Sequence, residues 1–146
     1  MTLQEAKVRI DAGEASIIVI KEGQQVYETQ GNGVAPLLRI VQTDKDILKG
    51  ATVVDRIVGK AAATVFTLCG AKEVYALTLS KAGKAYLEKH GIAVDCGSCI
   101  EMIENRQRNG MCPFENAVKN IEDPEEAYKA ISETLKNLMK NADKPA

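Results

Sequence analysis

The segment from Val53 to Cys69 constrains the fold most, because apolar residues cover nearly every side of it when it is drawn as a helix. These residues are Val53, Val54, Ile57, Val58, Ala61, Ala62, Ala63, Val65, Phe66 and Leu68. A helix that is hydrophobic all round is normally buried between the other layers of a domain. We therefore predict a central buried helix over 53–69 that ends at Gly70.

The rest of the chain alternates between strand and helix patterns. Strands rich in β-branched or apolar residues are predicted over 15–21 and 24–29, which form a hairpin, and over 73–79 and 92–95. Helices are predicted over 2–12, 36–41, 80–90, 98–106 and 112–121, and from Asp123 onward. Strands separated by helices usually pair in parallel, and the hairpin adds an antiparallel pair. We expect an α/β fold of three layers, α/β/α, around a mixed sheet.

Length and charge limit the classes of protein to consider. The chain has 146 residues and a formal net charge of −1. This length suits one domain, which we place at 1–141, followed by a frayed tail at 142–146. A nucleic-acid binder needs a concentrated basic surface, so we expect no nucleic-acid partner.

The chain also lacks the patterns of membrane and exported proteins. No apolar run approaches the length of a membrane span. The first residues, Met1 to Gly13, lack the apolar core of a secretion signal, so we expect a cytoplasmic location and no membrane partner. Cysteines in that compartment are thiols or ligands more often than disulfides.

The predicted central helix carries three charged residues, Asp55, Arg56 and Lys60. Burying a charged group costs several kcal/mol unless it is paired or lines a cavity. The charges therefore indicate a pocket, and Gly59 would let a ligand approach the backbone. A lysine in such a place can act as a base, an anion clamp or a nucleophile. Alternatively, Asp55 caps the helix while Arg56 and Lys60 lie on its solvated edge.

A second candidate site is the segment from Gly110 to Glu115. Pro113 fits the first position of a helix, which makes Cys112 the N-cap residue. The unpaired N–H groups and the helix dipole favour a thiolate there. Asn105 and Arg106 lie just upstream and could reach the same place. Alternatively, the segment is an ordinary helix cap that Glu115 closes.

The triplet Gly31-Asn32-Gly33 could also shape a phosphate-binding turn, although most such triplets are ordinary turns.

A third candidate is the cysteine cluster. Cys96 and Cys99 form a C-x-x-C motif, and Cys112 follows nearby. Two thiolates one helical turn apart can chelate a metal or close a small disulfide. A zinc site needs four ligands, and no further ligand stands at a recognised spacing. The alternative is that Cys96 and Cys99 are small apolar residues near a helix start.

Two motifs give the chain a resemblance to a known family. The first motif is Val58-Gly59-Lys60-Ala61-Ala62-Ala63, preceded by Asp55. The second motif is Glu104-Asn105-Arg106 together with Gly110-Met111-Cys112-Pro113-Phe114-Glu115. Together they resemble a small family of bacterial proteins of unknown function that is grouped by fold with the cytidine deaminases. The resemblance runs over nearly the whole chain. It implies a cytidine-deaminase-like fold and no established activity.

Zinc deaminases carry His-x-Glu or Cys-x-Glu at the start of a buried helix, and Pro-Cys-x-x-Cys at the start of the next. The corresponding region here, Asp55 to Ala61, holds neither His nor Cys, and no Glu follows. The second region, Leu79 to Lys84, holds no cysteine. The pair Cys96 and Cys99 comes one strand later. We therefore expect no zinc-dependent deamination, no metal and no cofactor.

The leading hypothesis is a protein that binds a small anionic, nucleotide-like molecule in one pocket. Lys60 and Cys112 would be the catalytic candidates, and Asp55, Asn105, Arg106 and Glu115 would bind the ligand. The alternative is a metal-binding or redox module that uses Cys96, Cys99 and Cys112. A third hypothesis is an interaction protein whose C-terminal helix pairs with a second copy to form a homo-oligomer.

Overall fold

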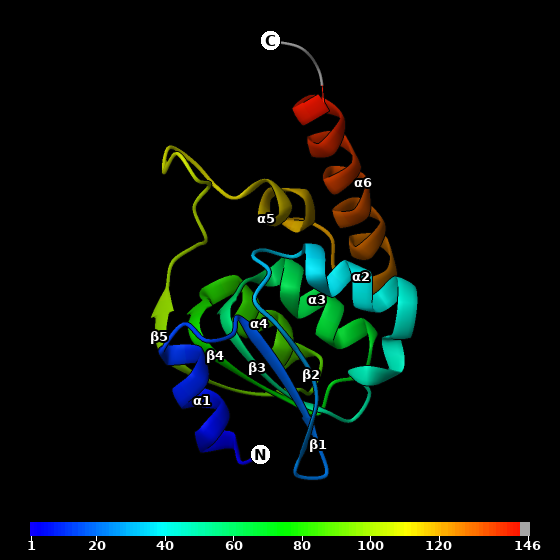
Figure 1. Cartoon of the computed structure of the whole chain (residues 1–146). Helices are drawn as coiled ribbons and strands as arrows, with labels where there is room; N and C mark the ends of the chain where they lie inside the picture. Colours follow the sequence, from blue (N-terminus) through cyan, green and yellow to red (C-terminus); the bar gives the residue numbers. More distant parts are fainter. Residues whose placement is uncertain (144–146) are drawn as a thin grey trace.

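Five strands form one mixed sheet in the order β2-β1-β3-β4-β5 in the computed structural model, which describes residues 1–143 (Figure 1). The strands are β1 (Ile17–Lys21), β2 (Gln24–Thr29), β3 (Thr52–Val58), β4 (Glu73–Ser80) and β5 (Ala93–Ile100). Strand β1 pairs antiparallel with both β2 and β3. Strands β3, β4 and β5 pair in parallel. The predicted mixed sheet is confirmed.

Helices cover both faces of the sheet, as the predicted three-layer arrangement requires. They are α1 (Leu3–Asp11), α2 (Ala35–Asp44), the short 3-10 helix η1 (Lys45–Ile47), α3 (Lys60–Leu68), α4 (Lys81–Lys89), α5 (Pro113–Val118) and α6 (Pro124–Asp143). Helix α1 packs Ala6 and Ile10 against Ile18 and Val54 on one face. Helices α2, α3 and α4 build the larger core on the other face, and α5 and α6 pack beyond α3.

The prediction of one long helix over 53–69 is wrong. The segment forms strand β3, turns at Gly59 and continues as the shorter helix α3. A central strand is buried on both faces and reads as a continuous apolar run, much as a fully buried helix does. The β-branched residues Val53, Val54 and Val58 favour the strand. Asp55 and Arg56 therefore lie on a strand, and Lys60 begins the helix.

The prediction of a helix over 98–106 is also wrong. Strand β5 continues to Ile100 because Ser98, Cys99 and Ile100 pair with the last residues of β4. Ser98 and Glu101 have the spacing of a capping box, which favours a helix start, but pairing across the sheet outweighs this local preference. The segment 101–112 is a protruding loop, which an isolated bridge between Glu104 and Met111 closes.

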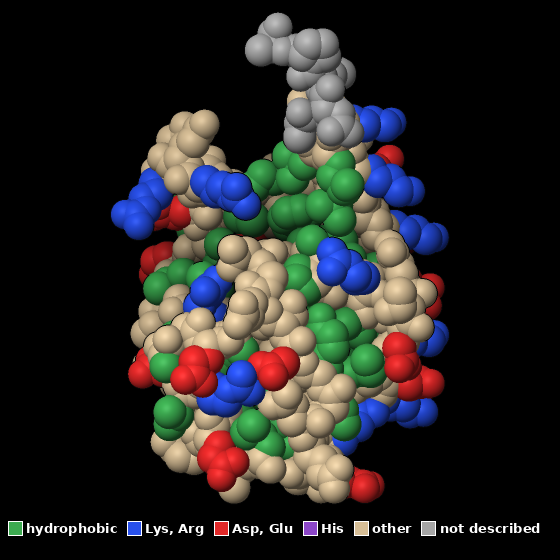
Figure 2. Space-filling model, viewed as in Figure 1, with side chains coloured by type: hydrophobic (Ala, Val, Ile, Leu, Met, Phe, Trp, Pro, Cys, Tyr) green, Lys and Arg blue, Asp and Glu red, His purple; other side chains and the backbone are tan. Residues whose placement is uncertain are grey.

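The final helix is the longest element, with 20 residues. Ala127 and Ile131 are fully buried, whereas Leu138 and Met139 in its outer half are 40% and 59% exposed. Figure 2 shows hydrophobic side chains gathered between the protruding loop and this helix.

Of the predicted tail at 142–146, α6 includes the first two residues, and the last three lie outside the described residues. Among residues 1–143, no helix is both long enough and apolar enough to span a membrane.

Candidate functional site

The turn between β3 and α3 lies at the centre of the candidate site. The backbone N–H groups of Lys60 and Ala61 both donate to the Glu115 carboxylate, at 2.8 Å each. A carboxylate at a helix N-terminus satisfies unpaired N–H groups and meets the positive end of the helix dipole. Glu115 comes from α5, more than fifty residues away in the chain, so this contact joins the two predicted motifs.

Gly59 is required at this turn for reasons of space. A Cβ atom at Gly59 would lie 2.2 Å from Glu115 Oε1 and 2.5 Å from Ile103 Cδ1. Helix α4 approaches from another side, since a Cβ atom at Gly83 would lie 2.9 Å from the Gly59 carbonyl carbon. Two glycines therefore allow α4, α5 and the β3–α3 turn to meet closely.

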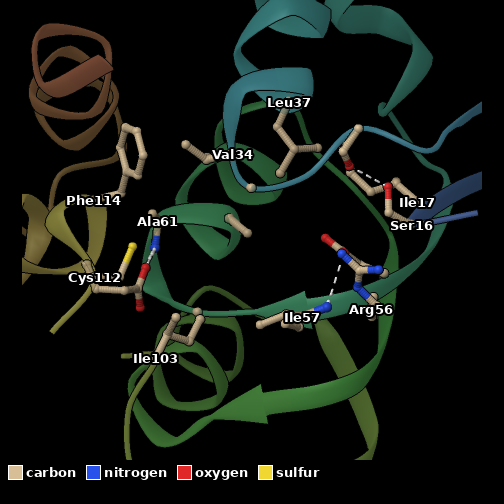
Figure 3. Close-up of a pocket in the computed structure, with 16 residues that line it drawn as sticks. Ser16, Ile17, Val34, Leu37, Arg56, Ile57, Ala61, Ile103, Cys112 and Phe114 are labelled. Atoms are coloured by element: carbon tan, nitrogen blue, oxygen red, sulfur yellow. Dashed lines mark hydrogen bonds between the residues drawn. The ribbon is translucent and has the colours of Figure 1, made fainter. Parts of the chain in front are cut away.

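A cavity of about 160 Å³, which we call the main cavity, opens beside this turn. Figure 3 shows its labelled side chains arranged around an open space, with Phe114 and Arg56 on opposite sides. The start of β1, the loop before α2, the end of β3, the start of α3 and the segment 112–115 contribute the walls. Its lining residues are Ser16, Ile17, Gly31, Gly33, Val34, Leu37, Asp55, Arg56, Ile57, Gly59, Ala61, Ala62, Ile103, Cys112, Phe114 and Glu115.

Two carboxyl groups in the main cavity have raised pKa values. Burial raises the pKa of Asp55 from 3.8 to about 7, although the N–H groups of Ile57 and Arg56 act in the opposite direction. Burial also raises the pKa of Glu115, against the effect of its two backbone donors and of Lys60. Asp55 can therefore be neutral near neutral pH, where it offers both a hydrogen-bond donor and an acceptor.

The polar groups around Asp55 are held by specific hydrogen bonds. Arg56 Nη2 donates to Asn32 Oδ1 at 2.7 Å, which ties the end of β3 to the loop before α2. The Ser16 hydroxyl donates to the carbonyl oxygen of Gly31, at 2.6 Å (Figure 3). A guanidinium has five N–H donors, so Arg56 keeps capacity to bind a ligand after pairing with Asn32.

The structure brings Asp55, Cys112 and Glu115 together around the main cavity. Cys112 is the N-cap residue of α5, and its thiol makes no capping hydrogen bond. The predicted partnership of Lys60 with Cys112 does not form. The Lys60 side chain lines a neighbouring cavity, where Nζ donates to the Lys119 carbonyl oxygen at 3.2 Å. Glu115 lines both cavities and separates them.

Asn105 and Arg106 do not line either of these cavities, contrary to the prediction. Both lie in the loop that replaces the predicted helix. The Asn105 side chain stabilises this loop, because Nδ2 donates to Asn109 Oδ1 at 2.7 Å and Oδ1 accepts from the Asn109 N–H. Arg106 is exposed to solvent.

Residues 5–135 match the protein family described as TM1506, domain of unknown function (DUF1893). The chain belongs to the DUF1893 family. The crystal structure of the DUF1893 family protein TM1506 from Thermotoga maritima resembles it with a TM-score of 0.80 and 24% sequence identity, over 90% of this chain and 88% of that one. At 24% sequence identity, this likeness shows that the two proteins share a fold and carries no conclusion about function. No curated protein matches the chain significantly.

Two deaminases resemble this DUF1893 member more weakly. The dCMP deaminase from cyanophage S-TIM5 has a TM-score of 0.47 at 14% identity, over 68% of this chain and 100% of that one. A diaminohydroxyphosphoribosylaminopyrimidine deaminase/5-amino-6-(5-phosphoribosylamino)uracil reductase from Thermotoga maritima has a TM-score of 0.49 at 14% identity, over 94% of this chain and 40% of that one. The expected resemblance to a family of unknown function is confirmed. At these TM-scores, the two likenesses say nothing about activity.

The cysteines of this DUF1893 member do not form the predicted cluster. Cys96 and Cys99 lie three residues apart on β5, so their side chains project from opposite faces of the strand. The helical spacing that would bring two thiolates together is missing because the predicted helix is a strand. Within the described part of the chain, no three His, Cys, Asp or Glu side chains are grouped so that they could hold a metal ion.

Several lining residues were not predicted as site residues. Phe114 lies inside the Gly110–Glu115 motif, and Gly31 and Gly33 belong to the triplet noted as a turn. Arg56 was noted only as one of the charges on the predicted helix. Ser16 carried no signal that separates it from other strand residues. It joins the cavity because β1 pairs beside β3 in the sheet.

Proposed function

We propose that the protein binds a small anionic molecule with one planar ring in the main cavity. The observation that supports the proposal is a largely apolar space of about 160 Å³ that is also lined by Arg56 and by two buried carboxyl groups, those of Asp55 and Glu115. An apolar cavity of about 150 Å³ accommodates a benzene ring. The ring would therefore fill the space between Leu37, Ala62 and Phe114, and any larger substituent would project from the mouth.

The polar residues suggest how such a ligand would be oriented. Arg56 would bind its negative group, because a guanidinium donates two parallel hydrogen bonds to a carboxylate or phosphate. Asp55, neutral at a pH below about 7, could donate to a ring carbonyl or ring nitrogen, or accept from a ring N–H. A pyrimidine bearing a carboxylate or a phosphate carries both kinds of group.

Cys112 is the nucleophilic candidate of this site, since its half-buried thiol lines the main cavity. Lys60 would act on the ligand only indirectly, because Glu115 binds its backbone N–H while its ammonium lies in the neighbouring cavity. The proposal therefore concerns binding, and Arg56 takes the anion-binding role that the sequence pattern suggested for Lys60.

Calorimetric titration with matched probes tests the proposal. The probes are single-ring pyrimidine carboxylates and pyrimidine nucleoside monophosphates, with the neutral pyrimidines and acetate as controls. We expect a ring that carries an anion to bind more tightly than either part alone. Arg56→Gln should weaken binding about tenfold, the loss expected for a charge-assisted hydrogen bond.

Arg39→Gln is the matched control, because Arg39 is exposed on α2 and does not line the main cavity. It should bind the probes as the unmodified protein does. Binding that Arg56→Gln and Arg39→Gln weaken equally would contradict the proposed site. So would the absence of binding by every ring-bearing anion at millimolar concentration.

A further inference from the structure

A second cavity, which we call the lysine cavity, lies on the other side of Glu115 and has a volume of about 270 Å³. Lys60, Lys89 and Lys119 line it, together with Tyr86 and Glu122. These residues come from the start of α3, from α4, and from the segment between α5 and α6. The lysine cavity shares Glu115 with the main cavity but contains neither Arg56 nor Cys112.

Lys60 is buried with weak compensation for its charge. Its side chain is 8% exposed, and its nearest carboxylate oxygen, Glu122 Oε1, lies 3.4 Å from Nζ. The Lys119 carbonyl oxygen at 3.2 Å and the face of the Tyr86 ring at 5.6 Å complete its described partners. An ammonium has three N–H donors and is costly to bury unpaired, so Lys60 retains capacity for another acceptor.

Glu122 bridges two of the lysines from the protein surface. Its Oε1 faces Lys60, and its Oε2 lies 3.2 Å from Lys89 Nζ. Lys89 and Lys60 lower the pKa of the Glu122 carboxyl, which keeps it ionised. The Glu122 side chain is 59% exposed, and exposed ion pairs contribute little to stability. A stronger anion could therefore take its place at small cost.

The other carboxylates of the lysine cavity are already engaged. Glu115 accepts from two backbone N–H groups, and Glu101 pairs with Lys81 outside the cavity. Among the described residues, the ammonium groups of Lys60 and Lys89 thus share a single bridging carboxylate, that of Glu122, while Lys119 contributes its carbonyl oxygen. Lysine is a compact point charge with three N–H donors that binds phosphate well.

The geometry points to the lysine cavity as a site for a phosphomonoester, whose phosphate takes the place of the Glu122 carboxylate between Lys60 and Lys89. A dianion would match the surplus positive charge more closely than one carboxylate does. The volume exceeds that of the main cavity, and Ala82, Ala85 and Met111 provide apolar wall for the ester group. This inference does not depend on the ligand proposed for the main cavity.

Backbone amide NMR titrations at constant ionic strength test the inference, with glycerol 3-phosphate and inorganic phosphate as probes. Neither probe has a ring that would fill the main cavity. Glycerol 3-phosphate should bind saturably, shift the amides of Tyr86, Lys89 and Glu122, and bind more tightly than inorganic phosphate. Equal affinity for both probes would overturn the assignment to a phosphomonoester and indicate a site for free phosphate.

Variants of exposed residues locate the binding without threatening the fold. Lys89→Gln should weaken glycerol 3-phosphate binding about tenfold, and Glu122→Gln should strengthen it several-fold by removing the competing carboxylate. Lys84→Gln is the matched control, because Lys84 is an exposed lysine on α4 that does not line the cavity. Arg56→Gln should leave this binding unchanged, which separates the result from that for the main cavity. Non-saturable shifts, or equal effects of Lys89→Gln and Lys84→Gln, would overturn the inference.

Discussion

Asp55 illustrates how a single residue links the fold to the candidate site. It is buried on β3, where its partners in the neighbouring strands are the apolar residues Ile17 of β1 and Ala76 of β4. Burial raises its pKa to about 7 in the folded protein, while the unfolded chain has the ordinary value near 3.8. The folded state therefore binds more protons between these two values. The contribution of Asp55 to stability is greatest at low pH and is lost as the pH rises through about 7.

Asp55→Asn should remove this pH dependence, because the amide is neutral throughout. Relative to the unmodified protein, the variant should gain stability between about pH 5 and about pH 8, by at most a few kcal/mol. Urea unfolding at the two pH values measures the difference. An unchanged difference between variant and unmodified protein at both pH values would show that Asp55 titrates normally.

Gly59 is a second residue whose identity follows from packing. Gly59→Ala should lower the free energy of unfolding by about 2–3 kcal/mol, because the added methyl group must displace the Glu115 carboxylate and Ile103. Gly110→Ala is the control, since a Cβ there would meet only Asn105 Nδ2, at an ordinary 3.7 Å. Urea unfolding of both variants checks the prediction. A loss of similar size in the control would show that the effect is not specific to the β3–α3 turn.

Among the secondary-structure elements, the sequence predicted local features better than segments that depend on distant partners. Helix α1 forms where it was expected and begins with a capping box of Thr2 and Glu5, and Cys112 is the N-cap residue of α5. The apolar run at 53–69 was ambiguous, because a strand buried on both faces lacks the alternation that marks a half-buried strand. The far end of β5 was missed because only its pairing with β4 makes it a strand.

The assignment of β5 leads to a prediction about the cysteines. Mild oxidation of the folded protein should not link Cys96 to Cys99, because the two thiols project from opposite faces of one strand. Alkylation should be fastest at the exposed Cys99 and slowest at Cys69, where burial both shields the thiol and raises its pKa. Peptide mass spectrometry after each treatment measures both. A Cys96–Cys99 disulfide would contradict the assignment and restore the redox alternative.

At the scale of the whole molecule, the fold class was predictable because it follows from the order of local patterns. A hairpin followed by strands separated by helices is enough to indicate a mixed sheet with helices on both faces. The candidate site was predictable only in part. Gly59 with Lys60, and the segment 110–115, were recognised as parts of a candidate site, but their connection through Glu115 is a contact over 55 positions. No local pattern shows that, once this contact forms, Cys112 lines the main cavity while the Lys60 ammonium lies in the lysine cavity.

The central claim is that the main cavity binds a single-ring anion, and a crystal structure of the protein with a pyrimidine carboxylate tests it most directly. We predict density for the ring between Leu37, Ala62 and Phe114, with the carboxylate on Arg56 and a ring polar atom within hydrogen-bond distance of Asp55. A main cavity that stays free of ligand at saturating concentration, or a pyrimidine carboxylate bound elsewhere on the protein, would contradict the account.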